Sequence, residues 1–138
     1  MWHAKQLVLH GGIIVLIGLL CGAPLGSAVV RKRGEEAIRA WRVAHTSLVM
    51  GGIFLLAVAG IVADLKLSAS ALNVLVWTLV AASYAFAVVL PTGARYQHRG
   101  LAPSPPFLNQ ALYGGNIAGA AGLLIGTASL VWGAYAAL

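Results

Sequence analysis

The sequence predicts an all-α membrane protein, a single domain over residues 1–138 in which a bundle of four helices crosses the bilayer. The chain is 60% hydrophobic and 9% charged, whereas soluble proteins average roughly 45–50% and 25%. Four stretches contain no Asp, Glu, Lys or Arg, and a spanning helix needs about 20 apolar residues. They are continuously apolar, without the alternation of barrel strands, so they are expected to be helices. The stretches cover residues 6–30, 43–63, 67–94 and 100–138.

The first helix is expected over residues 6–30, with a kink near its end. Pro24 has no backbone N–H to donate and disturbs the turn before it. Lys5 and the small residues after Pro24 would also suit a secretory signal peptide, but the apolar run exceeds the about 7–15 residues of such a segment.

The second helix is expected over residues 41–63 and the third over residues 68–90, joined by a tight hairpin at the outer surface. Before the second helix, residues 31–42 are typical of a short amphipathic extension. The third helix is predicted to end before Pro91, because residues 91–106 are rich in proline and glycine. This loop lies on the same side as residues 31–42, where it can cover the end of the bundle as a lid.

The fourth helix is expected over residues 107–137. Gly115 and Gly119 form one GxxxG pair, and Gly122 and Gly126 form another. Small residues at this spacing let helices approach closely. They could serve packing within the bundle or contact between subunits, and we expect a homo-oligomer.

The basic residues predict how the protein is oriented. Seven of the nine Lys and Arg residues lie in residues 31–42 and 91–106, and such loops stay in the cytoplasm. We therefore expect a multi-pass protein of the cell inner membrane with both termini outside. The charges are spread between apolar segments, so the net charge of +6 indicates the lipid bilayer as partner and no nucleic acid. Arg31 to Arg33 are expected to contact anionic headgroups.

Polar side chains inside a membrane are the default functional candidates, and here they include no acid within the apolar runs. This argues against a proton-coupled exporter, a carboxylate pair for acid–base catalysis and a zinc cluster. His45 is the main candidate, because Trp41 and Gly52 share its helix face and leave room for a flat ligand. A neutral His can ligate haem iron, and Arg42 could neutralise a propionate. Alternatively, His45 is an interfacial residue bonded to a neighbouring carbonyl. His10 is expected near the outer face, opposite His45.

A polar stripe on the fourth helix is expected at the same depth as His45. Asn109, Tyr113 and Asn116 follow each other at helical spacing, and Tyr84 on the third helix is placed at that level too. Uncharged hydroxyls and amides can orient a neutral substrate. The alternative is hydrogen bonding between helices.

These residues resemble those of two related groups of small membrane enzymes, the styrene oxide isomerases and the hydroxylaminobenzene mutases. The resemblance covers most of the chain and rests on short motifs. The matching motifs are His10-Gly11, Trp41-Arg42-Val43-Ala44-His45, Met50-Gly51-Gly52 and Arg99-Gly100-Leu101.

The resemblance implies that His45 is the axial ligand of haem b, with Trp41, Arg42 and Gly52 around the cofactor. In the isomerases the ferric iron acts as a Lewis acid on an epoxide oxygen, and a hydride shift yields an aldehyde. The mutases rearrange arylhydroxylamines to aminophenols. We therefore expect a haem-dependent isomerase for a small lipophilic aromatic substrate. Its further catalytic candidates are Tyr84, Tyr113 and Asn116.

One position departs from the isomerase pattern. The isomerases carry an Asn six residues after the ligand His, where this chain has Gly51. This difference argues against activity on styrene oxide itself but does not affect haem binding through His45. The competing function is a non-catalytic bundle, either a haem-binding protein or a subunit of a larger membrane complex.

Overall fold

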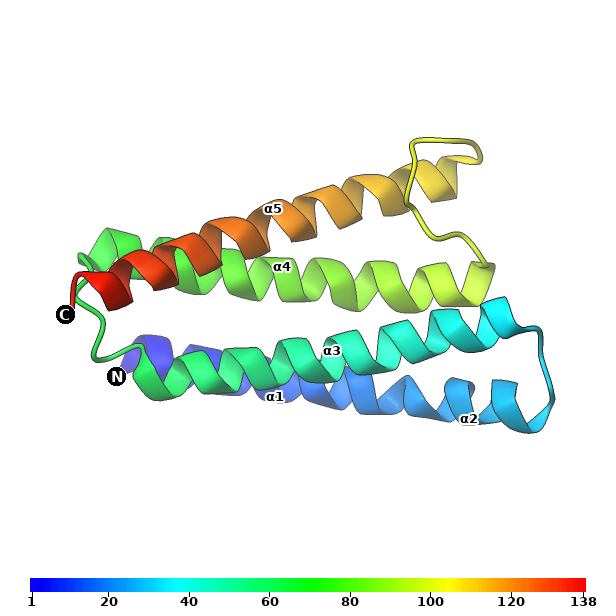
Figure 1. The fold of residues 1–138 in the computed structure, drawn as a ribbon, viewed down its shortest axis with the longest axis horizontal. Coiled ribbons are helices and arrows are strands. Elements are labelled where there is room, and N and C mark those ends of the chain that lie inside the picture. The colour runs from blue at the N-terminus through cyan, green and yellow to red at the C-terminus, as the bar shows by residue number, and fades with distance from the viewer.

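The structure is a computed structural model that describes residues 1–138, and it is entirely helical. Four spans are long and apolar enough to cross a membrane, with α1 and α2 sharing the first, so the predicted four-helix membrane bundle is confirmed. Both termini lie at one end (Figure 1). The opposite end, formed by residues 31–34, residues 97–106 and the adjacent helix turns, is called the basic end. The helices are α1 (Trp2–Leu20), α2 (Gly22–Val30), α3 (Glu35–Ile61), α4 (Ala69–Tyr96) and α5 (Phe107–Tyr135).

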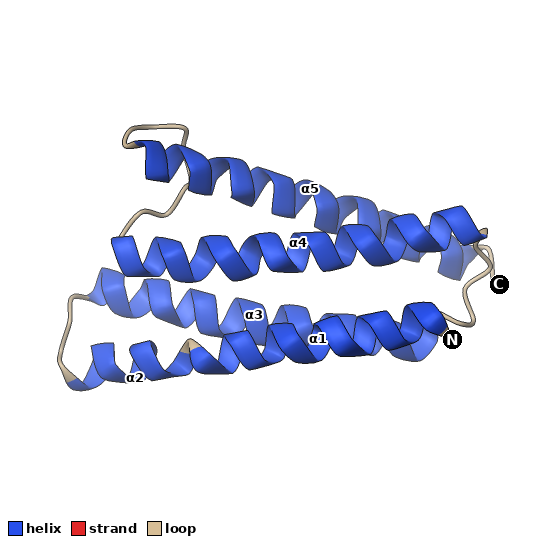
Figure 2. Ribbon diagram, turned by 180° about the vertical axis from the view of Figure 1, so that it is seen from behind, coloured by secondary structure: helices blue, strands red, loops and turns tan.

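The first span is interrupted at Cys21, as the predicted kink requires. Pro24 has no N–H to donate to the carbonyl of Leu20, and its ring crowds that carbonyl. The helix therefore breaks between α1 and α2 (Figure 2). Before the break, α1 packs against α3 and α4, whereas beyond it α2 contacts only α1 and α3.

The prediction that the third helix ends before Pro91 was wrong. α4 continues through Pro91 to Tyr96 and ends at Gln97, which adopts a left-handed conformation with φ of 58°. A proline removes one backbone bond, here to the carbonyl of Ala87, and membrane helices tolerate that loss because neighbouring groups and local adjustments can compensate it. The loop is therefore shorter than expected, over residues 97–106.

α3 also begins earlier than predicted, at Glu35 instead of residue 41. The expected amphipathic extension forms the first turns of the same helix. His45 consequently lies almost three turns inside α3, at about 3.6 residues per turn. Glu35 and Glu36 make no ion pair with Arg39 within 4.0 Å, so this charged turn is simply exposed.

Glycines bring the helices together in two close pairs, α1 with α3 and α4 with α5. A Cβ on Gly52 of α3 would lie 2.7 Å from the carbonyl oxygen of Gly11 on α1. On α5, a Cβ on Gly115 would lie 2.5 Å from Val89, and one on Gly126 would lie 2.5 Å from Leu79. α5 contacts no helix other than α4. The GxxxG glycines of α5 therefore pack within the chain.

The side chain of Asn109 holds the loop of residues 97–106 against α5. Its Oδ1 accepts from the backbone N–H of Gly100 at 3.0 Å, and its Nδ2 donates to the carbonyls of Ala102 at 2.9 Å and Ser104 at 3.0 Å. Asn109 is 8% exposed. The predicted stripe on α5 thus begins with a residue that organises the lid.

Asn109→Ala is expected to destabilise the folded protein by about 1–3 kcal/mol, because the buried N–H of Gly100 and the part-buried carbonyls of Ala102 and Ser104 lose their partner. Thermal unfolding in detergent, with limited proteolysis at residues 97–106, measures the effect. Gln110→Ala is the matched control, since Gln110 is exposed. Equal melting temperatures for the two variants would show that Asn109 does not hold the loop.

Candidate functional site

His45 is half-buried on the side of α3 that faces α1. Its Nδ1 lies 2.8 Å from the carbonyl oxygen of Gly18. Gly18 is where α1 approaches α3 most tightly near this histidine, because a Cβ there would lie 2.7 Å from the backbone nitrogen of Val49. Gly22, beyond the break, is less tightly packed, since its Cβ would lie 3.4 Å from Nδ1 of His45, an ordinary contact distance. Gly18 thus lets α1 and α3 approach closely enough for the imidazole to reach its carbonyl.

The Gly18 contact defines the tautomer of His45. A carbonyl oxygen can only accept, so Nδ1 carries the proton and donates it. In the neutral ring, Nε2 then has a free lone pair. Histidines that ligate metals usually donate their other N–H to a carbonyl or carboxylate in this way. The carbonyl-bonded interfacial histidine and the metal ligand are therefore compatible, because they use different nitrogens.

The other residues expected around a cofactor are only partly gathered at His45. Trp41 is half-buried one turn before it, and Arg42 is exposed. Gly52 does not lie beside open space, because α1 fills that face: a Cβ on Gly52 would lie 2.5 Å from Cγ2 of Val15. The expectation that Gly52 leaves room for a flat ligand below His45 was wrong, since helix spacing does not say which neighbour covers a face.

Tyr84 lies elsewhere in the bundle. Its hydroxyl is 2.9 Å from Nδ1 of His10, and the two rings meet edge-on at 5.5 Å between centroids. His10 and Gly18 are eight residues apart on α1, about 12 Å at 1.5 Å per residue. The placement of Tyr84 at the depth of His45 was wrong, because α4 continues past Pro91 and leaves Tyr84 deeper in the bundle. His10 is likewise well inside α1 and not at its outer end.

Tyr113 and Asn116 lie on α5, and α5 does not pack against α3, the helix that carries His45. Tyr113 is half-buried. Nδ2 of Asn116 donates to the carbonyls of Gly100 at 2.9 Å and Arg99 at 3.2 Å. Asn116 therefore holds the loop, and its partners are loop carbonyls rather than the neighbouring helix that the hydrogen-bonding alternative proposed.

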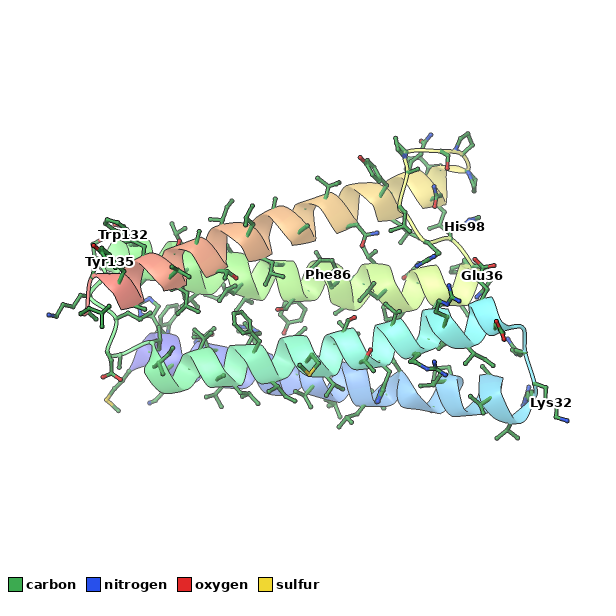
Figure 3. The ribbon with its side chains drawn as sticks, viewed as in Figure 1. Lys32, Glu36, Phe86, His98, Trp132 and Tyr135 are labelled. Atoms are coloured by element: carbon green, nitrogen blue, oxygen red, sulfur yellow. The ribbon has the colours of Figure 1, made fainter.

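The loop of residues 97–106 does border a cavity at the basic end, as expected of a lid. The cavity has a volume of about 390 Å³ and receives residues from α3, α4, the loop and α5. Glu36 and His98 lie at this end of the molecule (Figure 3). The loop of residues 97–106 thus borders a space that it shares with α3, α4 and α5.

A second, mostly apolar cavity of about 290 Å³ lies between α3, α4 and α5. Its lining was not predicted, because an apolar residue of a membrane helix can face lipid, a neighbour or a cavity without a difference in sequence. Among the lining residues, only Gly51 stood out in the sequence, because it replaces the Asn of the isomerases. It is six residues after His45 and therefore about 120° around the helix, and His45 itself does not line this cavity. The lining includes Ser47, Gly51, Phe54, Ser83, Phe86 and Leu90.

Comparison with known proteins agrees with the resemblance in the motifs. A family model described as styrene oxide isomerase matches residues 3–135. No curated protein and no solved structure matches the chain. The family match spans almost every residue, including the whole of the Trp41-to-His45 motif, and it supports an isomerase-like function. The chain therefore belongs to the styrene oxide isomerase family.

Proposed function

We propose that the protein is a membrane-embedded, haem b-dependent isomerase. Its substrate is a small aryl epoxide, rearranged to a carbonyl compound, or an arylhydroxylamine, rearranged to an aminophenol. The observation that carries the proposal is the bond from Nδ1 of His45 to the carbonyl of Gly18, within a chain of the styrene oxide isomerase family. That bond leaves Nε2 free as a single axial ligand.

His45 and its surroundings are suited to this role. When bound, ferric haem supplies a Lewis acid that withdraws electrons from a substrate oxygen. The carbonyl of Gly18 orients the imidazole and makes Nε2 more electron-rich. Substrate and product have the same composition, so no co-reactant is needed. Apolar helices exclude the water that would otherwise turn an opened epoxide into a diol.

The apolar cavity between α3, α4 and α5 supports the proposed class of ligand. Its volume of about 290 Å³ admits a single substituted aromatic ring, and Phe54 and Phe86 offer rings for edge-on or offset contact. Because His45 does not line this cavity, the cavity supports the ligand class and not the reacting position.

The membrane arrangement is part of the same proposal. The basic end, with its excess of Lys and Arg, would face the cytoplasm of a cell with this protein in its inner membrane, and both termini would lie outside. Attachment of a reporter enzyme at either terminus measures this orientation. The expected homo-oligomer and the catalytic contributions of Tyr84, Tyr113 and Asn116 stay predictions.

Product analysis with haem-loaded, detergent-purified protein tests the function. We expect either an aryl epoxide to give an isomeric aldehyde or ketone, or phenylhydroxylamine to give an aminophenol, by liquid chromatography with mass detection. The control is the same protein with His45→Gln. Haem-loaded protein that converts neither class of substrate would favour the competing function, a non-catalytic haem-binding bundle.

A further inference from the structure

A polar hollow opens at the basic end, next to the cavity bordered by the loop of residues 97–106. It shares Glu36 and Ala94 with that cavity and no residue with the apolar cavity. It has a volume of about 720 Å³. The hollow exists because α1 packs against α4 but α2, beyond the break at Cys21, does not. We call it the basic hollow. Its lining includes Pro24, Ser27, Arg33, Glu36, Trp41 and Arg95.

The charges of the basic hollow favour an anion. Arg33 comes from the loop after α2, and Arg95 comes from the last turn of α4. Neither guanidinium has a carboxylate within 4.0 Å, and Glu36 is the only acid in the lining. Arg95 is also held 5.6 Å above the ring of Tyr96. Two guanidinium groups without acidic partners suit the oxygens of a phosphate.

The two arginines are attached to well-defined helix ends. Lys32, after α2, and Gln97, after α4, are the only non-glycine residues with positive φ, at 50° and 58°. In both places a backbone hydrogen bond joins the residue after the turn to the last turn of the helix. The N–H of Arg33 donates to the carbonyl of Ala28, and the N–H of His98 donates to the carbonyl of Gly93. Such caps fix the direction in which the chain leaves the helix. Lys32 points away from the bundle (Figure 3).

Exposed apolar side chains continue from the hollow towards the middle of the membrane. Val88 is seven residues before Arg95 on α4, hence on the same face, and it is 66% exposed. Leu20, at the end of α1 beside the break, is 65% exposed. A ligand that places a phosphate between the arginines can lay a hydrocarbon chain along these residues. Free phosphate would contact the arginines but not the exposed apolar side chains.

We propose that the basic hollow binds an anionic phospholipid, with its phosphate between Arg33 and Arg95 and an acyl chain along α4 and the end of α1. Basic pockets between helices at the cytoplasmic side of a membrane are suited to such headgroups. Neither His45 nor any residue of the apolar cavity lines the hollow, but Trp41, one turn before His45, does. Lipid binding and haem content are therefore measured separately.

Native mass spectrometry of the haem-supplied protein, titrated with phosphatidylglycerol or phosphatidylcholine, tests this site. We expect selective binding of phosphatidylglycerol, weakened about fivefold per arginine removed in Arg33→Gln/Arg95→Gln. Arg39→Gln/Arg99→Gln is the matched control, since it removes the same charge from the same end, at residues that do not line the hollow. Arg33→Lys/Arg95→Lys should recover much of the affinity and guards against misfolding of the Gln variant.

Three results would overturn the lipid site. Equal weakening in the test and control variants would show a diffuse surface charge. Displacement of phosphatidylglycerol by glycerol 3-phosphate at similar concentration would show a site for soluble phosphates. Loss of haem from Arg33→Gln/Arg95→Gln, with phosphatidylglycerol binding unchanged, would assign the arginines to the carboxylates of the porphyrin.

Discussion

His45→Ala is expected to abolish haem binding, so that purified protein loses its Soret band and all turnover. The reason is that Nε2 of His45 has a free lone pair while Nδ1 is bonded to the carbonyl of Gly18 at 2.8 Å, and no other side chain in the chain is proposed as axial ligand. Absorption spectra of protein expressed with added haem, together with haem content per protein, measure the effect.

Two further variants separate ligation from folding. His45→Gln can still donate to Gly18 but offers only an amide oxygen to iron, so it should fold and remain colourless. His98→Ala, in the loop, should retain the Soret band. An undiminished band in His45→Ala would place haem elsewhere and remove the basis for the proposed site.

The other large effect is expected at Gly52, where α1 and α3 touch. A Cβ there would lie 2.7 Å from both the carbonyl oxygen of Gly11 and the backbone nitrogen of Val15. Backbone atoms cannot move away by rotating a side chain, so Gly52→Ala must separate the two helices. Overpacking of this kind costs about 1–3 kcal/mol, and sometimes more. Because His45 reaches Gly18 across the same contact, haem content should fall together with stability.

The neighbouring glycine is a matched control. Gly51 has no atom within 4 Å of the position of a Cβ, so Gly51→Ala should leave the melting temperature and the size-exclusion profile nearly unchanged. A Gly52→Ala protein as stable as Gly51→Ala would contradict the close contact between α1 and α3.

The spans could be predicted from sequence because hydrocarbon leaves the backbone few choices. The four stretches without charged residues predicted all four spans, and Pro24 predicted the kink in the first. Pro91 misled the prediction because the same residue type can end a helix or be tolerated within one. Its effect depends on whether surrounding helices compensate the missing bond, which the local sequence does not state.

The sequence singled out His45 but not its surroundings, and its role as haem ligand stays a prediction. The spacing from Trp41 to His45 identified the histidine, whereas its partner Gly18 lies on another helix, and a periodic pattern cannot say which helix packs against which. The misplaced end of α4 moved Tyr84 to the wrong depth, and Tyr84 bonds His10 instead. The basic hollow depends on the direction that α2 takes after its break, which is a property of the assembled bundle.

The most direct test of the central claim is the fate of an aryl epoxide deuterated at its terminal carbon, incubated with haem-loaded protein. An isomerase that moves hydrogen within the molecule should give an aldehyde of unchanged mass that retains the deuterium, and His45→Gln should give none. A diol, heavier by one water, or the absence of any product from this epoxide and from phenylhydroxylamine would contradict the proposed function.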